Sequence, residues 1–392
     1  MVSYSRMETI LFFHKMDTSS GRQRLEGLNA FAREVGWNVH CQSDPISKQD
    51  LASLVDLWKP VGAILSTNDG HTEYNASLFS PDNTVLQDCY PPSGIEKYTI
   101  VTTDSSATAR LALCELAGGK CAIYGFVPWT SRRLWSENRR QHFMRLAALA
   151  NLETCEFTPR CAWHDVAGQQ RELAAWLKSL PRPIGIMAAN DIVGFNVIAA
   201  CRMAGIQVPF ECKVVGVDND ELVCGRANPS LSSVELDFNT AGYKAGELLY
   251  RLVKGELVGK PLVSVPPLGF VRRGSSRVFL QTDRHALAAS EMILAKACGK
   301  LHAKDVLATF PCSRRLAEIR FRKATGRSVL EEIKAVRIKR AKQLLADPGR
   351  ELSAIAFQCG YDSETTFCRV FREETGMTMR GWRAANAAMR TR

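Results

Sequence analysis

The first 270 residues alternate short apolar runs with stretches of helical periodicity, and this alternation restricts the fold more than any other feature of the chain. Residues 9–13 form a strand-like run, and residues 22–34 follow with Leu25, Leu28 and Phe31 at helical spacing. Further strand-like runs lie at residues 38–41, 61–65, 120–125, 184–188 and 213–217. Strands that alternate with helices predict an α/β fold in which parallel sheets are wrapped by helices.

Polar side chains follow two of these runs directly. Asn190 and Asp191 come after one run, and Asp218 and Asn219 come after another. In open parallel sheets, ligands bind beyond the carboxyl ends of the strands. We therefore expect these four residues to lie at a binding site.

A nearby helical stretch adds Arg139 and Trp135 as candidates. Carboxylates and amides beside a guanidinium and an aromatic ring suit a polyol ligand, which needs many polar partners and one apolar face. Simpler roles stay open: Asp191 could be a helix cap and Trp135 a core residue, with neither contacting a ligand. The chain has no G-x-G-x-x-G, P-loop, G-x-S-x-G or H-E-x-x-H motif, so the pattern favours binding over catalysis.

The last quarter of the chain differs in charge and in pattern. Residues 286–392 carry 21 Lys+Arg against 11 Asp+Glu, so they hold ten of the eleven net positive charges. They show helical periodicity with no strand-like run, which predicts an all-α domain. A nearly neutral body with a basic end suggests a polyanion partner for that end, although a solvated charged surface is an equal alternative.

Two segments of this tail, residues 306–326 and 355–376, share one layout. In each, a short apolar helix meets a tight turn, and a serine, Ser313 or Ser363, can then cap a second helix. An aromatic ring follows eight residues after each serine, while the first positions of the second helix stay polar. This layout predicts two helix-turn-helix units whose second helices present their N-terminal residues to the major groove of DNA.

Residues 287–392 resemble the AraC-type DNA-binding domain, in which a long helix joins two helix-turn-helix units. Residues 337–345 fit the R-x-x-x-A-x-x-L-L pattern of that joining helix, and Pro311 and Met379 are two departures from the family. The resemblance implies that residues at the start of each second helix contact DNA. These candidates are Ser313, Arg314, Arg315, Glu318, Ser363, Glu364, Thr365 and Arg369.

Residues 1–272 resemble the LacI-type effector-binding domain, a two-lobed relative of the periplasmic sugar-binding proteins. The matching segments are 189–191, 214–218, 231–238 and Arg139 with Phe143. The resemblance implies a sugar ligand held by Trp135, Arg139, Asn190, Asp191, Asp218, Asn219 and Phe238. It also implies that the chain crosses between two lobes near residues 104–107, 234–238 and 266, and we place a linker at residues 273–286.

A LacI-type sensor followed by an AraC-type tail resembles the family of bacterial xylose operon regulators. That resemblance implies an activator of sugar-catabolism genes that binds D-xylose or a related pentose, with double-stranded DNA half-sites as partner. It also implies a homodimer, with RNA polymerase as a further partner, and no cofactor or metal. Because no secretory leader or membrane-spanning run is found, we expect a cytoplasmic protein.

Three other functions remain open on the sequence. The chain could be a sugar-processing α/β enzyme with a basic appendage. It could be an alkyl-transfer repair protein, although none of its thirteen cysteines lies in an evident motif. It could also be a regulator controlled by a partner protein, with a vestigial pocket.

Overall fold

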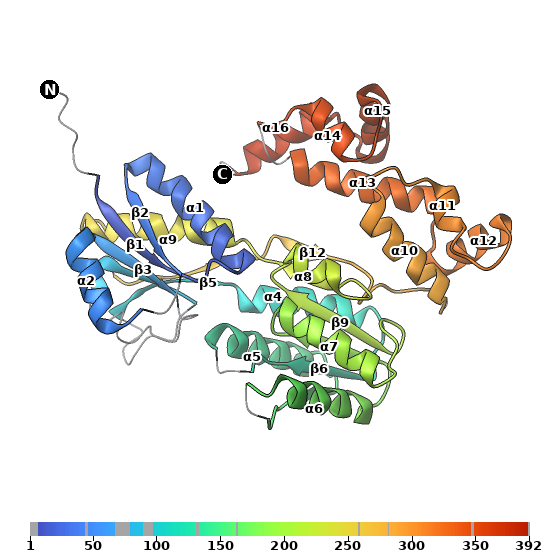
Figure 1. The fold of residues 1–392 in the computed structure, drawn as a ribbon, viewed down its shortest axis with the longest axis horizontal. Helices are drawn as coiled ribbons and strands as arrows, with labels where there is room; N and C mark the ends of the chain where they lie inside the picture. The colour runs from blue at the N-terminus through green and yellow to red at the C-terminus, as the bar shows by residue number, and fades with distance from the viewer. Residues whose placement is uncertain are drawn as a thin grey trace. The chain divides into compact units, whose positions relative to one another are not determined.

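The computed structural model describes residues 7–43, 46–66, 79–88, 97–130, 133–161, 164–257, 259–280, 282–345 and 349–390. The chain divides into a first unit, Met1–Ala227 with Leu231–Ser276, and a second unit, Asn228–Ser230 with Arg277–Arg392. The first unit is α/β and the second is helical (Figure 1). Of the expected linker 273–286, the residues up to Ser276 belong to the first unit, and helix α10 (Arg284–Lys296) begins near its other end.

The first sheet of the first unit has six parallel strands in the order β11-β5-β4-β3-β1-β2. The strands are β1 (Thr9–Phe13), β2 (Asn38–Gln42), β3 (Gly62–Ser66), β4 (Thr84–Gln87), β5 (Thr99–Thr103) and β11 (Leu262–Val265). Helices α1 (Ser19–Val35) and α9 (Phe238–Val253) cover one face, and α2 (Lys48–Trp58) covers the other. All residues of β1 and β3 are buried, as expected for a parallel sheet with both faces covered.

Helices α1 and α9 approach each other closely at two glycines. A Cβ atom on Gly27 would lie 1.9 Å from the Asn239 carbonyl oxygen, and one on Gly242 would lie 1.9 Å from the Arg24 carbonyl oxygen. Only glycine fits at either position. This close packing brings the Arg24 guanidinium over the Phe238 ring, 4.8 Å from its centroid.

The second sheet of the first unit has the order β12-β10-β9-β8-β6-β7. Its strands are β6 (Ile123–Val127), β7 (Thr154–Glu156), β8 (Ile184–Ala188), β9 (Cys212–Val217), β10 (Ser232–Glu235) and β12 (Gly269–Val271). Its helices are α4 (Ser105–Ala117), α5 (Leu134–Leu149), α6 (Val166–Ser179), α7 (Asp191–Met203) and α8 (Glu221–Arg226). The sheet is parallel except for the edge strand β12, which runs antiparallel to β10 because only three residues link it to β11 in the other sheet.

The chain crosses between the two sheets three times. It passes from β5 into α4 at Asp104, from β10 into α9 at residues 236–237, and from β11 into β12 at residues 266–268. These positions agree with the crossings expected from the resemblance to LacI-type sensors. The carboxyl ends of β1, β4, β6, β8 and β9 carry the residues of the pocket described below.

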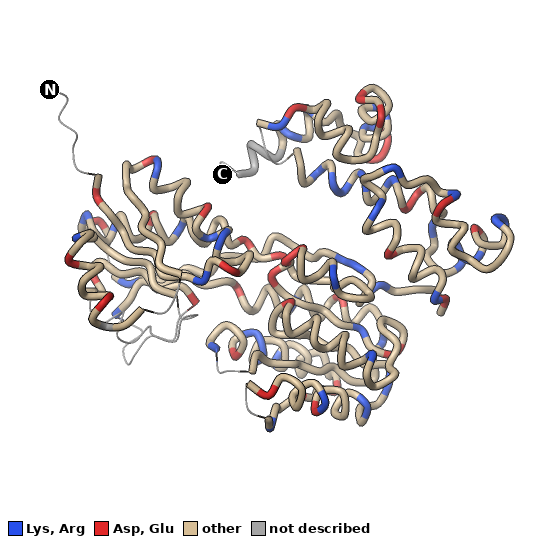
Figure 2. The backbone as a smooth tube through the Cα atoms, viewed as in Figure 1, with Lys and Arg blue, Asp and Glu red and all other residues tan. Residues whose placement is uncertain are grey.

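The second unit is helical throughout the residues that are described. Its helices are α10, α11 (Ala303–Leu307), α12 (Arg314–Thr325), α13 (Val329–Leu345), α14 (Leu352–Gln358), α15 (Glu364–Thr375) and α16 (Met379–Arg390). Helix α13 contributes Ile333 to one apolar core, around Phe321, and Ile338 to a second core, around Phe371. Lys and Arg recur along these helices (Figure 2). Two three-helix units joined by one long helix match the layout expected from the sequence.

Both departures from the AraC-type pattern leave the helices intact. Ser313 still caps α12 directly after the turn that contains Pro311, because its Oγ accepts from the Leu316 amide. Helix α15 ends at Gly376 in left-handed backbone, and buried Met379 begins α16. Across the chain, no described helix is both long enough and apolar enough to span a bilayer.

Candidate functional site

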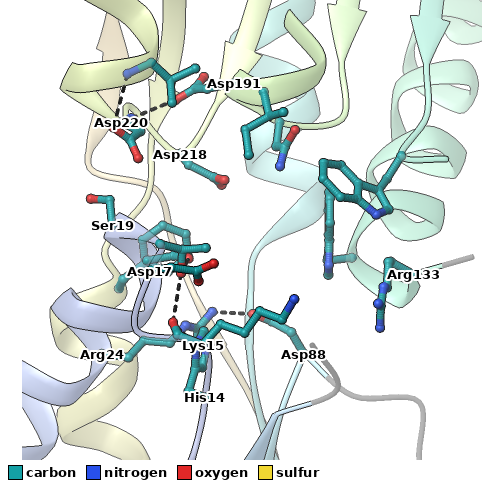
Figure 3. Close-up of a pocket in the computed structure, with 18 of the residues that line it drawn as sticks. His14, Lys15, Asp17, Ser19, Arg24, Asp88, Arg133, Asp191, Asp218 and Asp220 are labelled. Carbon is teal, nitrogen blue, oxygen red and sulfur yellow. Dashed lines mark hydrogen bonds and ion pairs between the residues drawn. The ribbon is translucent and has the colours of Figure 1, made fainter. Parts of the chain in front are cut away.

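One pocket of about 360 Å³ lies inside the first unit, where the carboxyl ends of strands from both sheets face each other (Figure 3). The residues from the first sheet and its helices are His14, Lys15, Asp17, Thr18, Ser19, Ser20, Arg24, Asp88 and Phe238. Those from the second sheet and its helices are Trp129, Arg133, Trp135, Arg139, Asn190, Asp191, Ile192, Asp218, Asp220 and Val223. The pocket thus contains all but one of the seven ligand-binding residues expected from the sequence.

Arg139 and Asp218 form one charged pair in the pocket. Arg139 is 3% exposed, and its Nη1 donates to the Ala189 carbonyl oxygen at 2.6 Å while its Nη2 lies 3.5 Å from Asp218 Oδ1. The guanidinium stacks on the Trp135 ring, and its Nε has no hydrogen-bond partner among the residues that the structure describes. Burial raises the pKa of Asp218 to about 6 against the opposing effect of Arg139 and Arg24. Near neutral pH, Asp218 is therefore mainly a carboxylate that can accept from a ligand.

Arg24 and Asp88 form a second charged pair, from the opposite sheet. Arg24 is 1% exposed and bonds Asp88, whose other oxygen accepts from the Thr102 hydroxyl at 2.8 Å. Within the described part of the chain, Arg24 Nε and Nη1 have no hydrogen-bond partner. Burial alone would raise the pKa of Asp88, but Arg24 and Thr102 hold it below its usual value. Figure 3 shows Asp218 pointing into the pocket from one side and the Arg24–Asp88 pair lying on the other.

This second pair was missed in the sequence. Arg24 occupies the same helical stripe as Leu28 and Phe31, and a charged residue in an apolar stripe is a signal that could have found it. Asp88 directly follows β4, whose four residues were too few and too polar at their ends to be recognised as a strand. His14 was also missed; burial and the charge of Arg24 lower its pKa to about 4, so its ring is neutral.

Asn190 and Asp191 both reach the pocket but differ in their local roles. Asn190 is the N-cap of α7, since its Oδ1 accepts from the Val193 amide at 3.1 Å. Asp191 is the first residue of that helix and accepts from the Ser233 hydroxyl at 2.6 Å and the Asp220 amide at 2.7 Å. Burial and the nearby Asp218 raise the pKa of Asp191 to about 8.

Asn219 does not line the pocket. Its side chain is buried in the second sheet, where Nδ2 donates to Glu235 Oε1 at 3.1 Å and Oδ1 accepts from Arg273 at 2.8 Å. Asn219 was expected to contact a ligand because, like Asp218, it directly follows a strand. The left-handed backbone at both residues (φ 108° and 56°) turns the two side chains apart.

The pocket favours binding of a neutral, polar ligand. Both carboxylates and arginines line its walls, together with the rings of Trp135 and Phe238, on which Arg139 and Arg24 stack. Hydroxyl groups can donate to the carboxylates and accept from the arginines, while C–H faces of a sugar ring stack on aromatic rings. Among the described residues, no cluster of three or more His, Cys, Asp or Glu side chains could hold a metal ion.

In the second unit, helix α12 presents a solvent-facing stripe opposite its buried residues. The stripe consists of Arg315, Ile319 and Arg322, and Arg314 lies beside it at the start of the helix. Glu318 is not part of this stripe, and its Oε1 accepts from the Val329 amide at 3.2 Å. Ile319 and Arg322 were not among the residues expected to contact DNA, although helical spacing from Arg315 could have found them.

Helix α15 presents the corresponding stripe of the other helix-turn-helix unit. Thr365, Arg369 and Arg372 lie opposite buried Phe367 and Phe371. Ser363 caps the helix through its Oγ and the Thr366 amide at 3.4 Å. The exposed Arg369 pairs with Glu373 one turn on, an ion pair that is easily exchanged for a contact with phosphate. Glu364, at the first position of the helix, is exposed.

Comparison with known proteins connects these two parts. Residues 100–276 match the family model of the periplasmic binding protein-like domain, and residues 307–385 match that of a helix-turn-helix domain. The xylose operon regulatory protein of Haemophilus influenzae is 31% identical over 374 residues, which cover 92% of this chain and 94% of the relative. The xylose operon regulatory protein of Escherichia coli is 27% identical over 402 residues, covering 98% and 99%.

A solved structure of a xylose-binding transcription activator has the same fold, with a TM-score of 0.59 at 24% identity over 98% of this chain and 99% of that one. The relatives are regulators and match across both units, so the chain is a DNA-binding transcription regulator with a ligand-binding sensor domain rather than an enzyme. By its identity and coverage, the chain belongs to the family of xylose operon regulatory proteins.

Proposed function

We propose that the first unit binds D-xylose or a related pentose and that the chain then activates sugar-catabolism genes. The observation that carries the proposal is the pair of facing ion pairs, Arg24–Asp88 and Arg139–Asp218, in one pocket. Both arginines keep buried N–H groups without protein partners, and sugar hydroxyls supply the missing acceptors. A volume of about 360 Å³ is small for a ligand pocket, which favours a single monosaccharide.

The sugar would act by linking the two sheets of the sensor. It would bond carboxylates and arginines that come from opposite sides of the pocket, so it binds best when the two sides are close. A ligand shifts an equilibrium only by its difference in affinity between two states. The closed arrangement would therefore gain population as the sugar binds.

On the DNA side, we propose that both helix-turn-helix units read the major groove. The proposed contacts are Ser313, Arg314, Arg315, Ser363, Glu364, Thr365 and Arg369, with Glu318 acting through its bond to Val329. We further propose that a homodimer places these helices on repeated half-sites, that the protein works in the cytoplasm, and that it contacts RNA polymerase when it activates.

A thermal-shift screen against pentoses and hexoses tests the effector. D-xylose at 100 times its dissociation constant should stabilise the chain by about 2.7 kcal/mol, which raises the melting temperature by several degrees. Asp218→Asn should lose the shift, whereas Asp82→Asn, in an exposed ion pair with Lys260, should keep it. If no sugar raised the melting temperature of the unchanged chain, the proposal would fail and a partner-controlled regulator would be favoured.

A further inference from the structure

The first unit ends in a short segment, residues 272–276, that is bonded firmly to the second sheet. Ser275 Oγ donates to the Val214 carbonyl oxygen at 2.6 Å, and Ser276 Oγ lies 2.8 Å from both Ser232 Oγ and Glu115 Oε1. The next residue, Arg277, is the first of the segment that continues into the DNA-binding unit. Residues 272–276 are therefore the last part of the first unit before the chain enters the DNA-binding unit.

Arg273 connects this segment to the turn that follows β9. Its amide donates to Ser232 Oγ at 2.8 Å, its Nη1 to the Leu231 carbonyl oxygen at 2.9 Å, and its Nη2 to Asn219 Oδ1 at 2.8 Å. The first two contacts hold Arg273 to β10. The third reaches a residue that is next in sequence to Asp218, which lines the pocket.

Asn219 receives two connections from the pocket. One is the peptide bond to Asp218, and both residues have positive φ angles, which few residues other than glycine, asparagine and aspartate adopt. The other runs through Ser233, whose Oγ accepts from the Asn219 amide at 3.0 Å and whose hydroxyl donates to Asp191 Oδ1 at 2.6 Å. Asn219 is 8% exposed and does not line the pocket, so it has no direct access to a ligand.

We infer that Asn219 and Arg273 are positioning residues that couple the pocket to the DNA-binding unit. This inference rests on the proposed function, because it requires that a ligand bind at Asp218 and Asp191. When hydroxyl groups bond these two side chains, the turn at residues 218–219 and the Ser233 hydroxyl both readjust. The Asn219 side-chain oxygen Oδ1 moves with the turn, and the Arg273 guanidinium moves with it because its Nη2 is bonded to that oxygen.

The role differs from ligand binding and from simple structural support. A ligand-binding residue changes the sugar affinity when it is removed, and a structural residue changes the free energy of unfolding. A coupling residue changes neither by much, but it reduces the factor by which the sugar alters DNA affinity. Arg273 is partly exposed, so water can enter the space that an alanine there leaves.

The test uses the full chain with D-xylose and a DNA site selected by the unchanged protein from a random-sequence pool. For the unchanged chain, Arg273→Ala, Asn219→Ala and the double variant, sugar affinity is measured by calorimetry and DNA affinity by fluorescence anisotropy with and without D-xylose. We expect each variant to bind D-xylose within about threefold of the unchanged chain. The sugar-dependent change in DNA affinity should fall from at least about fivefold to less than about twofold.

Three controls make the result specific. Arg251→Ala removes an exposed arginine of α9, outside the segment 272–276, and it should keep the full response. Arg273→Lys retains a cationic donor and should keep part of the sugar-dependent change in DNA affinity. The double variant should be no worse than either single variant, because both changes remove the same hydrogen bond.

The possible failures can be told apart. If D-xylose does not alter DNA binding by the unchanged chain, the proposed function fails and the coupling role fails with it. If the unchanged chain responds and Arg273→Ala responds equally, only the coupling role is overturned. If Arg273→Ala loses D-xylose binding itself, the residue supports the pocket and the coupling role is again overturned.

Discussion

Arg24 and Arg139 place two guanidinium groups inside the first unit, where very little water reaches them. Charges of this kind are tolerated only with a partner, because removing an ion from water costs several kcal/mol. Asp88 and Asp218 supply those partners, and Phe238 and Trp135 supply the ring faces on which the arginines stack. Some N–H groups of the two arginines have no partner among the described residues, so they can still donate hydrogen bonds to a ligand.

Removing one member of a buried pair should be costly. Asp88→Ala leaves Arg24 buried without its counter-ion, and we predict that the free energy of unfolding falls by about 3 kcal/mol. Urea unfolding followed by circular dichroism measures the change. Asp82→Ala removes an exposed carboxylate from the same side of the sensor and should leave the urea midpoint unchanged. Equal midpoints for the two variants would contradict the account of Arg24.

The affinity for a sugar should depend on pH through Asp218. Its pKa is about 6 and a hydroxyl group bonds the carboxylate more strongly than the acid, so affinity should fall toward tenfold per pH unit below 6. Of the groups that act on it, His14 has a pKa of about 4 and Asp191 a pKa of about 8, both outside the range from 5 to 7, and the pKa of Asp88 is held below its usual value. Calorimetry should find weak, pH-independent binding for Asp218→Asn. A flat profile for the unchanged chain would exclude Asp218 as an acceptor.

The helices and strands differ in how well the sequence predicted them. Strands β1, β3, β8 and β9 are long apolar runs whose burial on both faces is visible in their composition. Strand β4, with Thr and Gln at its ends, becomes a strand only because neighbouring strands pair with it. Apart from Phe238, the predicted pocket residues come from the second-sheet side. Arg24 shows in the sequence only as a charged residue in an apolar helical stripe, and Asp88 follows a strand that depends on its neighbours.

The contact between α1 and α9 sets the position of Arg24. We predict that Gly242→Ala destabilises the first unit by about 1–3 kcal/mol, because its Cβ would meet the Arg24 carbonyl oxygen and force the helices apart. Gly225→Ala is the matched control, since a Cβ there meets no atom within 4 Å. Thermal unfolding distinguishes the two. If both variants melted at the temperature of the unchanged chain, the close helix packing would be refuted.

Helix α12 should contribute to sequence choice through its outward stripe. An arginine that bonds a guanine edge through two hydrogen bonds contributes about 1–3 kcal/mol of discrimination. Arg315→Ala should therefore weaken binding to the selected DNA site by about tenfold or more while changing binding to random DNA far less. Lys323→Ala, exposed near the end of the same helix, should weaken both only slightly. Anisotropy titrations with the selected site and with random DNA measure both affinities. An equal loss of affinity for the two DNAs would indicate that Arg315 contacts phosphate instead of a base.

Taken together, the chain combines a nearly neutral sensor with a basic DNA-binding part, since residues 286–392 carry ten of its eleven net positive charges. In the proposed function, the charge provides attraction to DNA in general, and the stripes on α12 and α15 provide choice among DNA sequences. Regulation requires that the pocket and these stripes share one equilibrium, which is the role assigned to Asn219 and Arg273. Charge alone would give DNA binding that ignores the sugar.

That equilibrium is measured by the DNA affinity of the purified full chain in the presence and absence of D-xylose. The titration uses fluorescence anisotropy at two salt concentrations, and a hexose that gives no thermal shift serves as the control. We predict that D-xylose changes the affinity by about 5- to 150-fold at both salt concentrations, while added salt weakens all binding steeply. An affinity that stays the same with D-xylose and with every other sugar of the panel would contradict a sugar-responsive regulator.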